Sequence, residues 1–336
     1  MIKIENCQKL GEKERTQQLS KILITGGAGY LGSVMTRNLL KNHEVVVYDN
    51  LMYNQTSLVD LSSNPNFTFH YGDVREWSKL KKLVEQVDIV IPLAALVGFP
   101  LCEKDKELAT SINTTQIKNI VDTLTSDQKI LYPNTNSGYG SRGEGMVTEE
   151  DKLSPISHYG VTKCQSEDYI KNNSNGISLR LATVFGVSSR MRTDLLANDF
   201  VYKLLTDKYI TLFEHEFVRN FIHIQDVSSA FEFMIENYDK HQGEIFNVGL
   251  SDTNINKKQL VERIQIQIPN TSVTYSDYFE DPDKRDYIVS NEKIEATGWK
   301  PKYTLDDGIK ELIQSYKMIV PTQSQYRNTT PLSYEE

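Results

Sequence analysis

Residues 21–40 read KILITGGAGYLGSVMTRNLL. A short apolar run leads directly into a glycine-rich turn, and the turn leads into a segment with helical spacing of its apolar residues. Gly26, Gly29 and Gly32 are three residues apart, and residues 27–32 also fit the form G-x-G-x-x-G. Glycines in this pattern permit a tight turn and close approach of the backbone to a diphosphate, and the helix N-terminus offers free N–H groups to phosphate.

An acidic residue closes the next apolar run, VVVYDN, about twenty residues after the glycines. This residue, Asp49, can accept hydrogen bonds from ribose hydroxyls and would repel a 2′-phosphate. No Lys or Arg lies between Asn50 and Leu58 to bind such a phosphate. The pattern therefore predicts a dinucleotide site that prefers NAD to NADP. Asp73 and Val74 follow the third run, where the adenine of a dinucleotide would lie.

Short apolar runs alternate with amphipathic segments over the first half of the chain. Continuous apolar strands that alternate with helices are typical of a parallel sheet covered on both faces. The sequence therefore predicts an α/β fold with a Rossmann-type, doubly wound parallel sheet. The predicted strands are residues 21–25, 44–49, 67–73, 88–95, 129–134 and 176–186, with helices such as 77–86 and 194–205.

The regular alternation is lost after Gly186, where residues 213–226 and 278–293 are polar and read as irregular. We therefore expect a smaller, discontinuous C-terminal domain that binds the substrate. The predicted division is an N-terminal extension at 1–20, a dinucleotide-binding domain at 21–187 plus about 224–252, a substrate domain at about 188–223 plus 253–318, and a solvated tail at 319–336.

Composition excludes several other classes of protein. The chain has 336 residues, 39% of them hydrophobic, and a net charge of −8, which disfavours nucleic-acid binding. No apolar run approaches the roughly eighteen residues of a membrane helix, and residues 1–20 lack the apolar core of a secretory signal. The three cysteines are far apart and the histidines are scattered, which predicts a cytoplasmic protein without a metal site.

Six motifs occur in the order typical of one enzyme family: TGGAGYLG, YGDV, LAAL, YPNTNSGYG, SHYGVTK and RNFIHIQDV. Together they resemble the extended short-chain dehydrogenase/reductases, and more narrowly the NAD-dependent nucleotide-sugar epimerase/dehydratase family, over roughly residues 21 to 318. The Tyr159–Lys163 pair alone would say little, because this spacing occurs by chance in many helices. The resemblance implies NAD as cofactor, a nucleotide-sugar substrate and a homodimer.

The resemblance also implies roles for individual residues. Tyr159 would take a proton from a sugar hydroxyl, which requires its pKa to fall by about three units from its usual 10, or about 4 kcal/mol. Lys163, one helical turn later, would stabilise the phenolate, and Thr135 would join the proton network. The implied cofactor contacts are Gly26, Gly29, Tyr30, Leu31, Gly32, Asp49, Asn50, Asp73, Val74, Leu93, Ala94, Ala95, Tyr159 and Lys163.

Departures from the family pattern narrow the reaction. Members that eliminate water or decarboxylate carry acidic residues after the Ser/Thr, whereas Asn136 and Ser137 here cannot serve as general acids. Members that epimerise at two carbons carry a cysteine in this stretch, and none is present. Hydride chemistry at C4 remains, ending in a ketone (dehydrogenase) or in hydride return to the other face (epimerase). A non-catalytic NAD-binding protein is the third alternative.

Arginines are the expected substrate anchors. Arg219 and Arg285 match positions that hold the substrate diphosphate in the family, and a guanidinium binds phosphate bidentately; the alternative is surface arginines in ion pairs. Arg190 is a further candidate. Several stretches, SRMR and DPDKRDY among them, are similar to the GDP-heptose 4-dehydrogenases of capsule synthesis. The full set of predicted substrate contacts is Asn136, Ser137, Thr183, Arg192, Asn198, Arg219 and Arg285.

Overall fold

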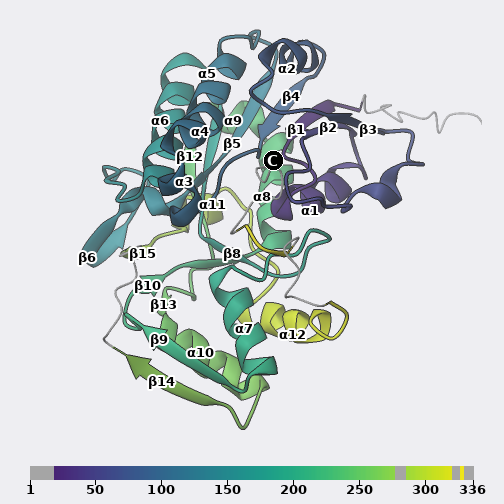
Figure 1. Ribbon diagram of the computed structural model, residues 1–336. Coiled ribbons are helices and arrows are strands. Elements are labelled where there is room, and N and C mark those ends of the chain that lie inside the picture. The colour runs from purple at the N-terminus through teal and green to yellow at the C-terminus, as the bar shows by residue number, and fades with distance from the viewer. Residues whose placement is uncertain (1–18, 277–284, 320–325, 329–336) are drawn as a thin grey trace, which may run out of the picture.

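A seven-stranded sheet forms the centre of the protein (Figure 1). The computed structural model describes residues 19–276, 285–319 and 326–328. All neighbouring strands of the sheet are parallel, in the order β12-β7-β5-β4-β1-β2-β3, which confirms the predicted doubly wound α/β fold. The strands are β1 (Lys21–Thr25), β2 (Glu44–Asp49), β3 (Phe67–Tyr71), β4 (Ile89–Pro92), β5 (Lys129–Thr135), β7 (Ile177–Leu181) and β12 (Ile245–Val248).

Helices cover both faces of this sheet, because successive residues of each strand point to opposite sides. In β1, Ile22 and Ile24 pack in the same cluster as Met35, whereas Leu23 packs in a second cluster with Leu80. The first cluster includes α1 (Tyr30–Leu39) and α8 (Ile224–Glu236); the second includes α2 (Trp77–Val84), α5 (Gln116–Val121) and α6 (His158–Asn173).

The C-terminal part of the chain builds a smaller layer beneath the sheet (Figure 1). Helices α7 (Leu196–Thr206), α10 (Lys257–Gln267) and α12 (Leu305–Ser315) pack on one another, and β9 (Tyr209–Phe213) pairs with β14 (Ser272–Ser276). The remaining elements are η1 (Val59–Leu61), α3 (Phe99–Lys104), α4 (Lys106–Thr110), η2 (Ser111–Thr115), η3 (Asn136–Tyr139), β6 (Ser141–Val147), β8 (Thr183–Phe185), β10 (Val218–Arg219), β11 (Phe221–His223), α9 (Tyr238–His241), β13 (Ile255–Asn256), β15 (Asp286–Val289) and α11 (Glu292–Ala296). The predicted domain boundaries stay a prediction.

Three details differ from the sequence-based expectation. The predicted strand 176–186 is two strands, because β7 pairs with β5 and β12 whereas β8 pairs with β11. The segment 213–226 contains β10, β11 and the start of α8, so it is not irregular. In 278–293, β15 forms by pairing with β6, while 278–284 lies outside the described residues.

The predicted solvated tail is also wrong at its described part. The carbonyl of Tyr326 accepts hydrogen bonds from the N–H and hydroxyl of Thr193, at 2.9 and 3.2 Å. The N–H of Asn328 donates to Asp194 at 3.3 Å. Residues 326–328 therefore pack on the loop between β8 and α7. The predicted N-terminal extension falls almost wholly outside the described residues.

Candidate active site

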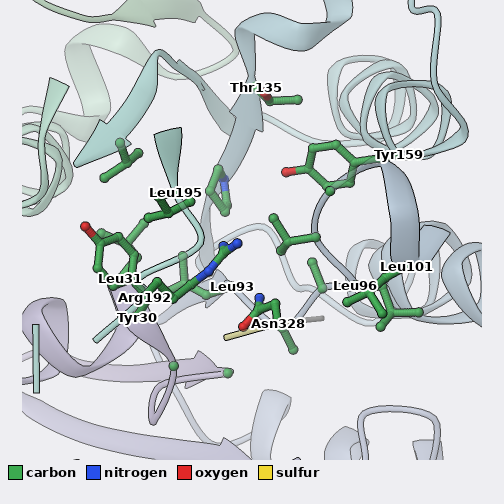
Figure 2. Close-up of a pocket in the computed structure, with 18 of the residues that line it drawn as sticks. Tyr30, Leu31, Leu93, Leu96, Leu101, Thr135, Tyr159, Arg192, Leu195 and Asn328 are labelled. Atoms are coloured by element: carbon green, nitrogen blue, oxygen red, sulfur yellow. The ribbon is translucent and has the colours of Figure 1, made fainter. Parts of the chain in front are cut away.

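One cavity of about 720 Å³ opens at the carboxyl ends of β1, β4 and β5. These ends meet where the strand order reverses, which is the usual ligand site of a doubly wound sheet, and the volume suits a small-molecule ligand. Figure 2 shows side chains that converge on the cavity from separate elements. The predicted residues among its lining are Gly26, Gly29, Tyr30, Leu31, Gly32, Asp49, Asn50, Asp73, Val74, Leu93, Ala94, Ala95, Thr135, Ser137, Tyr159, Lys163, Thr183, Arg192, Arg219 and Arg285.

The glycine turn brings the N-terminus of α1 to the cavity wall. Gly26 has φ +71°, and a Cβ at this position would lie 2.7 Å from the backbone nitrogen of Ala94. Helix α1 starts after Gly29 without a side-chain cap and without an acidic residue in its first turn. Its first N–H groups therefore have no competing side chain and fit the diphosphate of a dinucleotide.

Asp49 joins the end of β2 to the glycine turn. Its carboxylate accepts hydrogen bonds from the N–H groups of Ala28 (3.0 Å) and Leu51 (2.8 Å) and from Nε2 of Gln55 (3.3 Å). Burial raises the pKa of this carboxyl, and the hydrogen bonds oppose that rise. A carboxylate has about four acceptor sites, so it retains capacity for a ribose hydroxyl. The contact with ribose stays a prediction.

The predicted catalytic residues come from α6 and β5. Ser157 caps α6 by accepting from the N–H of Gly160 at 3.2 Å, which places Tyr159 in the first turn and Lys163 one turn later. Figure 2 shows the hydroxyl of Tyr159 directed into the cavity. At the end of β5, the hydroxyl of Thr135 lies 2.9 Å from that of Ser137.

Burial is the main cause of the pKa shifts of Tyr159 and Lys163. It raises the pKa of Tyr159 to about 12, Cys102 adds to the rise, and Arg285 and Arg192 oppose it. Burial also lowers the pKa of Lys163 to about 7, against the attraction of Glu167. Desolvation of both side chains therefore outweighs the effects of their neighbours, and the stabilisation of a Tyr159 phenolate by Lys163 stays a prediction.

The lowered pKa of Lys163 has a measurable effect on stability. An unfolded lysine titrates near 10.4, so between pH 7 and about 10 the unfolded chain binds more protons than the folded protein. The free energy of unfolding should therefore rise with pH across this window, by about 4 kcal/mol at most. We expect Lys163→Met to remove this rise in urea unfolding without added NAD.

The matched control is Lys79→Met, because Lys79 is an exposed lysine in a surface ion pair with Glu76. Its pH profile should follow that of the wild type. An unchanged pH dependence in Lys163→Met would show that Lys163 titrates near its ordinary value when folded.

A buried ion pair next to the predicted catalytic residues has no counterpart among the predictions. Glu167, one turn after Lys163, pairs with Arg180 at 2.7 Å, and both side chains are at most 4% exposed. Glu167 also accepts from the amide of Asn134 at 2.7 Å, and Arg180 donates to the hydroxyl of Tyr139 at 2.9 Å. The pair therefore fixes α6 against β5 and β7. The one feature of the sequence that could have indicated a role for Glu167 is its spacing of four residues from Lys163, which places both on one face of the helix.

Two predicted substrate contacts do not line the cavity. The amide of Asn198 accepts from the N–H of Gly186 at 3.1 Å and donates to the carbonyl of Arg192 at 2.8 Å, so it is used in holding a loop. Asn136 is 1% exposed and is not among the residues that line the cavity. The geometry gives these two residues no access to a substrate.

Other predicted residues have partners at the cavity. Arg192 pairs with Asp194 at 2.7 Å, and Arg219 donates to the carbonyl of Val218 at 3.0 Å. Arg285 donates to the hydroxyl of Ser137, which connects it to Thr135. Lining residues that the sequence analysis did not single out include Tyr53, Asp194, Lys257, Tyr287 and Asn328.

Comparison with known proteins identifies the family. The model of the NAD-dependent epimerase/dehydratase family matches residues 22–249. The chain belongs to this family. As a member, it is an enzyme that uses NAD, and the glycine turn and Asp49 fit that cofactor.

The individual relatives share a low sequence identity with this chain. The low-salt glycan biosynthesis protein Agl12 of Haloferax volcanii is 26% identical over 309 residues, covering 88% of this chain and 98% of that protein. The dTDP-4-dehydro-6-deoxyglucose reductase of Escherichia coli is 28% identical, covering 88% and 97%. The UDP-glucuronic acid 4-epimerase of Bacillus cereus, solved with UDP-glucuronic acid and NAD, has a TM-score of 0.77 at 26% identity, covering 89% and 99%.

In the part of the chain that the structure describes, no helix has the length and apolar character needed to cross a membrane. The same residues contain no group of three or more His, Cys, Asp or Glu side chains placed to hold a metal ion.

Proposed function

We propose that this epimerase/dehydratase family member oxidises the C4 hydroxyl of a nucleotide-linked sugar. One observation supports this reaction over elimination or decarboxylation: the carboxylates at the cavity already have hydrogen-bond or ion-pair partners. Those among the described lining residues are Asp49, Asp73, Asp194 and Asp199. Asp49 accepts backbone hydrogen bonds, and the other three pair with Arg75, Arg192 and Lys203 at 2.6 to 2.8 Å.

An acid catalyst beside Thr135 would be needed to expel water from a sugar. The two residues after Thr135 are an amide that does not reach the cavity and a hydroxyl that bonds to Thr135 itself. Proton transfer at one hydroxyl is therefore the chemistry that these side chains support best.

The proposed roles follow from the geometry. After Tyr159 has lost its own proton to solvent, its phenolate Oη takes the proton of the sugar hydroxyl, while the hydroxyls of Thr135 and Ser137 orient that hydroxyl. Bound NAD supplies the hydride acceptor for such an oxidation. Burial lowers the pKa of Lys163 to about 7, and in its charged form this lysine favours the phenolate.

The nucleotide diphosphate is proposed to lie against the arginines that line the cavity. Arg219 and Arg285 line it together with Arg192, whose ion pair with Asp194 holds its guanidinium in place. Guanidinium groups bind diphosphate bidentately and offset the acidic net charge of the chain.

The fate of the ketone separates two forms of this proposal. Release of a 4-keto sugar makes the protein a dehydrogenase, for which the sequence resemblance suggests GDP-heptose and polysaccharide synthesis as the setting. Reduction of the ketone from the other face makes it a 4-epimerase, which the similarity to the Bacillus cereus epimerase supports. A cytoplasmic homodimer is proposed on the same resemblance.

The deciding experiment incubates the protein with NAD and a panel of GDP-heptose, GDP-mannose, UDP-glucose, UDP-glucuronic acid and UDP-N-acetylglucosamine. Nicotinamide absorbance and product NMR are followed together. We expect NADH to accumulate with a 4-keto sugar. A new C4 stereoisomer without NADH would establish the epimerase instead, and a 6-deoxy product would contradict the proposed chemistry.

A further inference from the structure

A buried arginine with two unused donors lies at the cofactor end of the cavity. Arg190 belongs to the loop between β8 and α7, lines the cavity and is 3% exposed. Within the described part of the chain, its Nε and Nη2 atoms are enclosed and have no hydrogen-bond partner. Arg192, two residues later, differs because Asp194 engages its Nε and Nη2.

An enclosed guanidinium without a carboxylate is unfavourable, because the lost hydration is not replaced. The centre of the Tyr53 ring lies 4.3 Å from the guanidinium carbon. This cation–π contact replaces part of the lost hydration. Burial lowers the pKa of Arg190 to about 10, and Arg192 adds to this effect. The group is still charged at neutral pH, so it carries a positive charge into the cavity.

Hydrogen bonds place this loop against the first turn of α1. The hydroxyl of Ser188 donates to the carbonyl of Tyr30 at 2.7 Å and accepts from the N–H of Arg190 at 3.2 Å. The hydroxyl of Tyr30 donates to the carbonyl of Gly186 at 2.8 Å. The charge of Arg190 also acts on Asp49, at the end of β2. The loop of Arg190 therefore packs against the start of α1, next to the glycine turn.

We propose that the guanidinium of Arg190 binds the diphosphate of the dinucleotide, opposite the N-terminus of α1. A guanidinium can bind two oxygens of one phosphate in parallel. The first turn of α1 supplies N–H donors without a side-chain cation, so a cation from the facing loop completes the anion site. A 2′-phosphate fits less well, because the Asp49 carboxylate would repel it.

The test compares ligands that share adenosine and differ in phosphate. In Arg190→Met, we expect the Kd values of NAD, ADP-ribose and ADP to rise about 10- to 100-fold, as for a lost charged hydrogen-bond pair, while that of adenosine changes less than about twofold. Calorimetry measures the first three ligands and an NMR titration the last. Arg190→Lys keeps the positive charge but lacks the paired N–H donors of a guanidinium, so it should give an intermediate loss of affinity.

Thermal unfolding provides a second readout that does not depend on turnover. The Tm of Arg190→Met without added ligand should equal or exceed that of the wild type, because an unpaired buried charge is removed. The increase in Tm caused by NAD should shrink. Arg263→Met, which removes an exposed arginine paired with Asp306, should retain the full increase.

Three results would overturn the proposal. Unchanged diphosphate binding in Arg190→Met would show that the guanidinium does not reach the ligand. Equal losses for ADP and adenosine would assign Arg190 a role in shaping the adenosine pocket. A loss confined to NADP would assign it to the 2′-phosphate. None of these results depends on the identity of the sugar.

Discussion

Replacing Tyr159 by Phe is expected to reduce turnover about a thousandfold, because the side chain can no longer accept the proton of the sugar hydroxyl. The ring and its packing remain, so the fold and the affinity for NAD should change little. Turnover is measured with the nucleotide sugar that the panel identifies, and NAD binding is measured by calorimetry on the same sample. The combination of lost turnover and retained binding is the expected result.

Tyr169→Phe is the matched control, since Tyr169 lies on the same helix and donates its hydroxyl to Asp122 on the surface, at 2.6 Å. Its turnover should stay near that of the wild type. Full activity in Tyr159→Phe would rule out Tyr159 as the base. A loss of NAD binding equal to the loss of turnover would indicate a structural role instead.

Replacing Glu167 by Gln should have the largest effect on stability. The change leaves the guanidinium of Arg180 buried without a countercharge, and loss of one partner of a buried pair costs about 3–5 kcal/mol. The amide also disturbs the hydrogen bond from Asn134. The measured quantity is the urea midpoint of unfolding, at unchanged slope.

A double variant separates the cost of an unpaired charge from the value of the pair. Glu167→Leu combined with Arg180→Met removes both charges and fills similar space, so it should recover most of the lost stability. A double variant as unstable as Glu167→Gln would mean that the hydrogen bonds to Asn134 and Tyr139, and not the charge, hold this region together.

The features that could be predicted from the sequence depend on neighbours along the chain. The glycine turn lies directly between a strand and a helix, and Asp49 closes the strand that follows, so residue spacing alone predicts the sheet and the position of the cofactor end. Tyr159 and Lys163 are one turn apart on one helix and therefore reach the same cavity.

The features that could not be predicted depend on segments that meet only in the folded protein. The amide of Asn198 has backbone partners in a loop that precedes its helix, so its type and position suggested a substrate contact that its geometry does not allow. The charge of Glu167 is matched by a residue on another strand. The sequence offers Arg190 only as a further candidate for a substrate contact, because spacing alone does not show which end of the cavity its loop reaches.

The cavity wall is assembled from both ends of the chain, from Gly26 in the turn after the first strand to Asn328 beyond the last helix. During synthesis, domains fold from the N-terminus as the chain emerges. The glycine turn and the first strands leave the ribosome early, whereas Asn328 leaves it only after α12. A nascent chain can therefore form the glycine turn long before its cavity has a complete wall.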